Sequence, residues 1–210
     1  MIRKNHKAAL NELSASEGVF TTAQAARLGI PRNTLSHQTA VGNAVRIAHG
    51  AYRLASTPSG FTDELAALWK LTAPSTFTYE RLTAPEADGI IIGGSTAASL
   101  LGIGDFHLSP YRIYSPTRIN SRIEAINFAT RPVDPRDITI IEGLPVTRPE
   151  RTLVDLCLDF EDPSLIENAF LDAVAKGVDV NRIGTIIESL PGKKRNRDAL
   201  APLDGLLSPA

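Results

Sequence analysis

The sequence contains a single cysteine, and this scarcity excludes two classes of small protein. Cys157 has no second cysteine to pair with, so the chain has neither an internal disulfide framework nor a zinc site built from several thiolates. The four histidines also lack the spacing of paired metal ligands; they are His6, His37, His49 and His107. We therefore expect a protein without a metal or other cofactor.

Long apolar runs and aromatic residues are also scarce. No apolar run approaches the roughly 20 residues that a membrane-spanning helix needs, so we expect no membrane partner. The chain starts Met-Ile-Arg-Lys without the apolar stretch of a secretory signal, which favours a cytoplasmic protein. Only 6% of the residues are aromatic but 43% are hydrophobic, so the core must be built mainly from aliphatic side chains.

Charge is distributed unevenly along the chain. Residues 1–56 hold seven basic and two acidic side chains, a net charge of +5. The remaining residues hold 15 basic and 21 acidic side chains, a net charge of −6. The asymmetry predicts an N-terminal module that binds a polyanion, although chance fluctuation in a short segment is the alternative interpretation.

The N-terminal residues show the pattern of a winged helix-turn-helix. Three short helices are predicted over about residues 3–16, 22–28 and 31–41, each followed by glycine. Thr21 and Gln24 have the spacing of a capping box at the start of the second helix. Two short strands, 45–48 and 51–54, follow with a turn at His49-Gly50. We assign residues 1–56 to a DNA-binding domain.

The spacing of three small or apolar residues supports this assignment. Ala25 allows two helices to approach closely, Gly29 permits the sharp turn between them, and Leu35 fastens the second helix to the core. With Leu35 inward, Arg32, Asn33, Ser36 and His37 should face outward along the front of the third helix. The N-terminal part of this helix is the part that enters the major groove.

The predicted DNA contacts follow from this orientation. Arg32 can pair with guanine and Asn33 with adenine, while Ser36 and His37 can reach a base or a phosphate. Arg46, His49 and Arg53 on the hairpin can contact the backbone or the minor groove. Thr22 completes the candidate DNA-binding set. The alternatives are an ordinary solvated helix face and a strand edge kept soluble by charge.

The rest of the chain predicts an α+β fold overall. A linker is predicted at residues 56–60, then a mixed α/β domain at 61–190 with a small sheet and terminal helices, then a flexible tail at 191–210. Strands are expected at 111–114, 123–129 and 137–141, and a helix at about 62–73. Residues Thr147–Glu150 resemble a second capping box. The basic run 193–197 is either an auxiliary DNA contact or a solvated terminus.

Several segments, in this order, resemble AbiEi-family antitoxins. They are Gly18–Ile30, Arg46–Leu54, Ile91–Gly102 and Gly143–Asp155. The resemblance implies an antitoxin of a bacterial type IV toxin–antitoxin, or abortive-infection, system that represses its own promoter by binding operator DNA. It also implies a nucleotidyltransferase-like toxin as functional partner, not necessarily in direct contact.

Two other functional classes compete with a repressor. Gly93-Gly94-Ser95 resembles a nucleophile elbow, with Asp105 and His107 nearby, but an N-cap serine is the simpler interpretation. We therefore predict no enzymatic activity and place a DNA-targeted hydrolase or nuclease last.

The third class is an effector sensor, in which the second domain binds a small molecule in a pocket. Arg151 and Asp155 have the spacing of a surface ion pair, and Cys157 is expected to be buried and inert.

Overall fold

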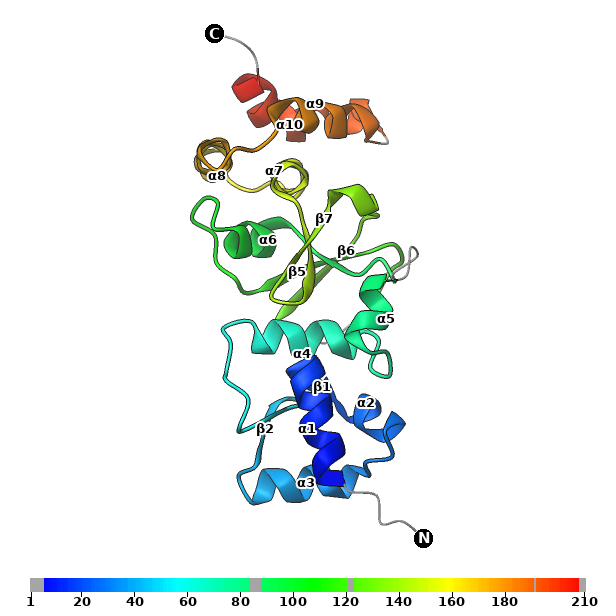
Figure 1. Cartoon of the computed structure of the whole chain (residues 1–210). Helices are drawn as coiled ribbons and strands as arrows, with labels where there is room; N and C mark the ends of the chain where they lie inside the picture. The colour runs from blue at the N-terminus through cyan, green and yellow to red at the C-terminus, as the bar shows by residue number, and fades with distance from the viewer. Residues whose placement is uncertain (1–5, 84–87, 121–122, 191, 208–210) are drawn as a thin grey trace. The chain divides into compact units, whose positions relative to one another are not determined.

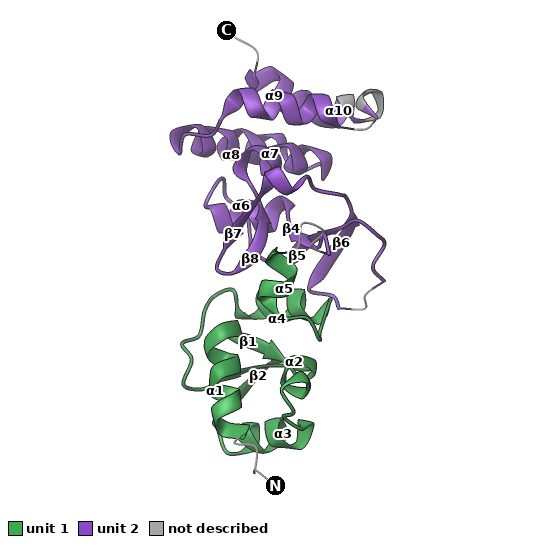
Figure 2. Ribbon diagram, turned by 45° about the vertical axis from the view of Figure 1, so that its right-hand side comes forward, with its two compact units in different colours: residues 1–87 green, residues 88–210 purple. Residues whose placement is uncertain are grey.

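The computed structural model describes residues 6–83, 88–120, 123–190 and 192–207. The chain divides into two compact units, unit 1 at Met1–Ala87 and unit 2 at Asp88–Ala210 (Figure 2). No helix in the described residues is long and apolar enough to cross a membrane. The predicted α+β class, with N-terminal helices and a small sheet before an α/β region, is confirmed.

Unit 1 begins with the element order of a winged helix-turn-helix (Figure 1). The order is α1 (His6–Glu17), β1 (Val19–Thr21), α2 (Thr22–Arg27), α3 (Arg32–Ala40), β2 (Ala44–Ala48) and β3 (Ala51–Leu54). The strands form an antiparallel sheet in the order β1-β3-β2. Sequence reasoning missed β1 because three buried residues are too short to show a strand's alternation.

Local signals set the ends of α2 and α3. The Thr21 hydroxyl accepts from the Gln24 N–H at 3.0 Å, and the Thr21 N–H donates to Gln24 Oε1 at 2.8 Å, so the predicted capping box is confirmed. Gly29 has a φ of +75°, which allows the turn. Pro31 is the N-cap of α3 rather than its first helical residue, because its ψ of 152° is extended.

Two further helices complete unit 1 and correct the predicted domain boundary. These are α4 (Asp63–Leu71) and α5 (Thr78–Thr83). Ala67 of α4 is buried with Val19 and Ala51 of the sheet, and the units divide after Ala87 rather than at 56–60. The Pro- and Gly-containing stretch is therefore a loop within unit 1, because the helix that follows it packs back on the sheet.

Unit 2 is built on a five-stranded mixed sheet. Its strands are β4 (Ile91–Ile92), β5 (Tyr111–Ser115), β6 (Ile126–Thr130), β7 (Ile138–Ile141) and β8 (Leu144–Thr147), in the order β6-β5-β4-β8-β7. Strand β8 lies inside the sheet and is wholly buried. It was not predicted because Pro145 interrupts its sequence, and proline is uncommon in a central strand.

The helices of unit 2 are α6 (Gly94–Leu101), α7 (Pro149–Leu158), α8 (Pro163–Ala175), α9 (Val180–Ser189) and α10 (Lys193–Leu207), with the 3-10 turn η1 at Pro135–Asp137. Helix α7 contacts α6, α8, α9 and α10, and in Figure 1 it lies between the sheet and the last helices. Leu153, Val154 and Leu156 on α7 are fully buried in the main core cluster.

The last helix corrects the expectation of a flexible tail at 191–210 over the residues that it covers, while 191 and 208–210 lie outside the described residues. Leu200 and Leu203 of α10 are buried in the core cluster of unit 2, beside α7 and α8. The segment reads as polar because its first residues are basic, yet its second half carries an apolar face. The basic run 193–197 is the candidate auxiliary DNA contact, and the side chains of most of it lie outside the described residues.

Candidate nucleic-acid interface

The front of α3 is exposed as the sequence predicts. Arg32, Asn33, Ser36 and His37 are exposed, while Leu35 between them is buried. On a helix of 3.6 residues per turn, positions 32, 33, 36 and 37 share one side. Polar hydrogen-bonding side chains therefore occupy the N-terminal two turns of the helix that a winged helix-turn-helix presents to the major groove.

Helix α3 is held by a short turn from α2. The Ile30 N–H donates to the Ala25 carbonyl at 3.0 Å, which closes the turn around Gly29. Ala25, Ile30 and Leu35 are buried in one cluster with Leu13 and Phe20. The direction of the exposed face of α3 is thus fixed by the core rather than by its polar residues.

The hairpin wing places two of its three predicted contacts in solvent. Arg46 and His49 are exposed, and an Arg46 guanidinium nitrogen lies 2.6 Å from His49 Nδ1. This contact requires an unprotonated His49 Nδ1, because a guanidinium only donates hydrogen bonds. Both side chains are therefore presented together at the turn between β2 and β3.

Thr22 connects the wing to the start of α2. Its N–H and its hydroxyl both donate to the Gly50 carbonyl, at 2.8 and 3.3 Å. The side chain is half-buried. It anchors the hairpin turn beside the helix-turn-helix, and in this geometry its hydroxyl proton is already used within the protein.

Arg53 is occupied inside unit 1 rather than presented on the wing. Its Nε lies 2.9 Å from the Asp63 carboxylate, and its guanidinium also donates to the Leu54 and Thr57 carbonyls. The expectation that it contacts DNA overlooked Asp63, which α4 brings back from beyond the supposed linker. Only 11% of its side chain is exposed, so we leave it out of the proposed contact set.

A buried ion pair behind the sheet was not foreseen. Lys70 of α4 lies 2.5 Å from the Glu17 carboxylate at the end of α1, and only 5% and 2% of the two side chains are exposed. Thr78 donates its N–H and hydroxyl to the same carboxylate, and Gln24 donates at 3.1 Å. Burial alone raises the pKa of Glu17, but the charge and hydrogen bonds of Lys70 and Thr78 outweigh it and lower this pKa.

Internal pairing determines which cations of unit 1 remain available. Arg27, Arg53 and Lys70 pair with Glu80, Asp63 and Glu17. By contrast, the exposed side chains of Lys7, Arg32 and Arg46 have no ion pair within the described residues. Residues 1–87 hold nine basic and six acidic side chains, a net charge of +3, against 13 basic and 17 acidic, or −4, in unit 2. The positive excess thus remains in the unit that carries α3.

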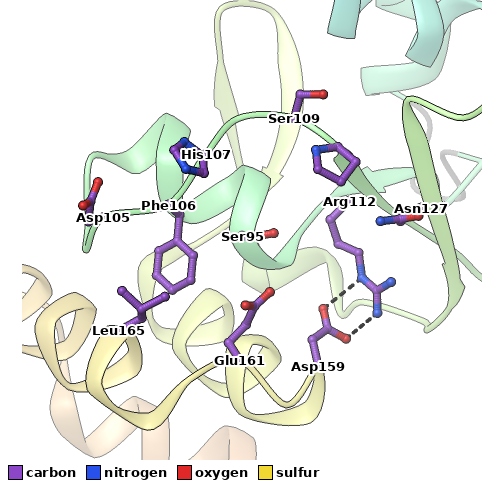
Figure 3. Close-up of a pocket in the computed structure, with 11 residues that line it drawn as sticks. Ser95, Asp105, Phe106, His107, Ser109, Arg112, Asn127, Asp159, Glu161 and Leu165 are labelled. Atoms are coloured by element: carbon purple, nitrogen blue, oxygen red, sulfur yellow. Dashed lines mark hydrogen bonds and ion pairs between the residues drawn. The ribbon is translucent and has the colours of Figure 1, made fainter.

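Unit 2 contains a pocket of about 410 Å³ (Figure 3). Ser95, Asp105 and His107, the residues of the nucleophile-elbow interpretation, all line it. No hydrogen bond joins these three side chains in the described part of the chain, and the N-cap of α6 is Gly93 rather than Ser95. The other lining groups include Arg112, Glu161, Phe106 and Leu165.

The glycine pair before α6 is explained by packing. A Cβ on Gly93 would lie 1.9 Å from the ring of Tyr114, and one on Gly94 would lie 2.8 Å from the Asp159 carboxylate. The Tyr114 ring therefore needs the space that the absent side chain of Gly93 leaves. The resemblance to a nucleophile elbow arises from this close approach.

Arg112 and Asp159, which line the pocket, belong to a connected network of aspartates and arginines. Arg112 makes two hydrogen bonds to Asp159, at 2.9 and 2.6 Å, and Arg131 bridges Asp159 and Asp155 at 2.7 and 3.1 Å. The Tyr114 hydroxyl donates to Asp159 at 2.9 Å. Burial raises the pKa of Asp155 to about 6, against the opposing attraction of Arg151 and Arg131.

Helix α7 corrects two local predictions. Arg151 and Asp155 do pair, at 3.0 Å, but both are buried rather than on the surface. The N-cap of α7 is Arg148 and has no side-chain cap, because the Thr147 hydroxyl instead bonds that of Thr152 at 2.7 Å. Buried Cys157 agrees with its prediction, and burial raises its pKa to about 12. The described residues contain no group of three or more metal-ligating side chains.

Comparison with known proteins finds a family match in the N-terminal region. Residues 8–55 match the family model of the transcriptional regulator, AbiEi antitoxin. The resemblance seen in the sequence is thereby confirmed over this range, which we call the AbiEi-type domain. The matched range runs from within α1 to the end of β3, and the segments quoted from unit 2 lie outside it.

A solved structure shares the fold over most of the chain. The crystal structure of the RV2827C protein from Mycobacterium tuberculosis matches with a TM-score of 0.54 and 16% sequence identity, covering 93% of this chain and 80% of its own. The similarity therefore extends past the AbiEi-type domain into unit 2. No curated protein matches the chain.

Proposed function

We propose that this protein is a sequence-specific, DNA-binding transcriptional repressor that acts in the cytoplasm as the autoregulating antitoxin of a type IV system. One observation carries the DNA-binding part: Arg32 and Asn33 stand exposed in the first turn of α3 while Leu35 anchors that helix. The positive charge of unit 1 and the AbiEi-type domain support the same conclusion. Ser36, His37, Arg46 and His49 extend the contact set to phosphates and the wing.

The experiment measures binding to the duplex upstream of the protein's own coding sequence. Arg32→Ala should weaken specific binding by about 1–3 kcal/mol, because a bidentate guanine contact is lost. Arg136→Ala is the matched control, since that arginine is 80% exposed in unit 2 and its removal takes away the same charge. Equal affinity of the two variants for the operator would refute the docking of α3.

The antitoxin role rests on the AbiEi-type domain alone. The partner is a nucleotidyltransferase-like toxin, neutralised without a required direct contact. Co-expression with the product of the adjacent reading frame provides the test. If the neighbouring product arrests growth and this protein relieves the arrest, the antitoxin role is supported. If the arrest is not relieved, or if the neighbouring product does not arrest growth, the protein is a repressor that neutralises no toxin.

The pocket in unit 2 favours a second candidate, a regulator that senses a small effector. Its volume of about 410 Å³ suits a metabolite, and it combines the apolar side chains Phe106 and Leu165 with charged and hydroxyl groups. A thermal-shift screen of amino acids and amines, followed by operator binding with each hit, tests this candidate. A hit that leaves DNA affinity unchanged argues against sensing.

A further inference from the structure

The turn between α4 and α5 grips the first helix of the helix-turn-helix. The Thr21 hydroxyl donates to the Pro74 carbonyl, Gln24 Nε2 donates to the Thr76 carbonyl at 2.8 Å, and Arg27 donates to the Ser75 carbonyl at 2.7 Å. These three side chains belong to the N-cap, the first turn and the last residue of α2. We call residues 74–80 the α2 clamp.

An ion pair closes the clamp at its far end. Glu80 accepts two hydrogen bonds from the Arg27 guanidinium, at 2.7 and 2.8 Å, and one from the Phe77 N–H at 2.7 Å. The guanidinium also lies over the Phe77 ring, 4.3 Å from its centre. The hydrogen bond from Arg27 lowers the pKa of Glu80 to about 2, so the carboxylate is charged at neutral pH.

The contacts that the clamp makes with α2 are connected to α3 through the core. Ala25 of α2 accepts the hydrogen bond that closes the turn, and it is buried with Ile30 and Leu35. Phe77 of the clamp and Leu28 at the end of α2 pack against the same cluster. A displacement of α2 would therefore shift the buried side chains that support α3.

We propose that the α2 clamp is part of the DNA-reading apparatus and that Glu80 is a positioning residue, acting through Arg27 and α2 on the angle of α3. The inference rests on the proposed DNA binding but goes beyond it, because the clamp lies outside the AbiEi-type domain. Glu80 itself touches no DNA in this proposal. Its contribution is to make α3 enter the groove in one orientation.

A charge-neutralising substitution separates positioning from electrostatics. Glu80→Gln in the full chain removes a negative charge, which by itself strengthens binding to polyanionic DNA. Loss of positioning should instead weaken binding, by about two- to fivefold, to a duplex selected from a random pool by the wild-type protein. Glu12→Gln is the matched control, because Glu12 is exposed on α1 and makes the same charge change.

Two further measurements keep the inference testable. The double variant Arg27→Glu/Glu80→Arg restores an ion pair with the original net charge, so it should bind more tightly than the two single changes predict together. Amide hydrogen exchange in α2 should speed up in Glu80→Gln and not in Glu12→Gln. Equal DNA affinity of Glu80→Gln and Glu12→Gln, or unchanged exchange in α2, overturns the proposed role of the clamp. Absence of any selected duplex refutes the proposed function instead, and the exchange measurement still decides the clamp.

Discussion

The two units bury carboxylates in opposite electrostatic settings. In unit 1, Glu17 receives hydrogen bonds from Lys70, Thr78 and Gln24, and its pKa is lowered. In unit 2, Asp155 shares its two arginines with neighbouring aspartates, one of its oxygens has no hydrogen-bond partner within the described residues, and its pKa is raised. The comparison shows that burial alone does not set the direction of the shift; the direction depends on whether the neighbouring charges and hydrogen bonds outweigh burial.

Two residues allow the units to be followed separately. Trp69, the single tryptophan, is buried in unit 1, and Cys157, the single cysteine, is buried in unit 2. Tryptophan fluorescence therefore reports unfolding of unit 1, and thiol labelling reports opening of unit 2. The predictions below use one or both of these reporters.

The largest expected effect is Lys70→Met in unit 1. It leaves the Glu17 carboxylate buried without its cation, which should cost about 3–5 kcal/mol in the free energy of unfolding. Trp69 fluorescence during urea titration measures the loss. Adding Glu17→Gln removes the orphaned charge and should restore a large part of the stability; a double variant as unstable as Lys70→Met would contradict this account.

The corresponding change in unit 2 is Gly93→Ala. The new methyl group would overlap the Tyr114 ring, and the forced repacking should cost about 3 kcal/mol. Labelling of Cys157 under urea is the measurement. Gly143→Ala is the control with an unobstructed Cβ, and its loss should come from its φ of +74° alone. Similar losses in both variants would rule out the overlap as the cause.

The pH dependence of the two units should have opposite signs. Since the folded-state pKa of Glu17 is lowered, its contribution is complete above the unfolded value of 4.5 and is lost as the pH falls below it. The folded-state pKa of Asp155 is raised from 3.8 to about 6, so unit 2 loses about 3 kcal/mol as the pH rises through this window. Urea titrations from pH 3.5 to 7, repeated with Asp155→Asn, test both trends. The comparison is refuted if unit 1 does not lose stability as the pH falls, or if unit 2 does not lose stability as the pH rises.

The smallest effect concerns the Cys157 thiol in the native protein. Burial raises its pKa to about 12, so thiolate is almost absent at neutral pH. Iodoacetamide should therefore leave it unmodified without denaturant, and label it at the rate of unit 2 unfolding when urea is added. Rapid labelling in native buffer would show that unit 2 opens without global unfolding.

The sequence predicted the features that depend on neighbours close in the chain. The capping box of Thr21 and Gln24, the turn at Gly29 and the inward Leu35 are all local patterns, and they determine the exposed front of α3. Features that join distant segments escaped prediction. The partner of Arg53 is ten residues away beyond a loop, and that of Glu17 lies 53 residues away.

Two other misses came from signals with more than one physical meaning. Proline and glycine at 56–60 mark a loop, but they do not show whether the chain returns to the same core. Ser95 before a predicted helix suits an N-cap, but the N-cap of α6 is Gly93, whose missing side chain makes room for the Tyr114 ring.

The packing of α4 on the back of the three-stranded sheet has a practical consequence for protein engineering. Transplanting residues 8–55 onto another scaffold would leave Val19 and Ala51 uncovered and would strand Glu17 without Lys70. The smallest transplantable DNA-binding unit consequently runs from α1 through Thr83. A chimaera with this boundary keeps the apolar face of the sheet covered by α4 and keeps Glu17 paired with Lys70.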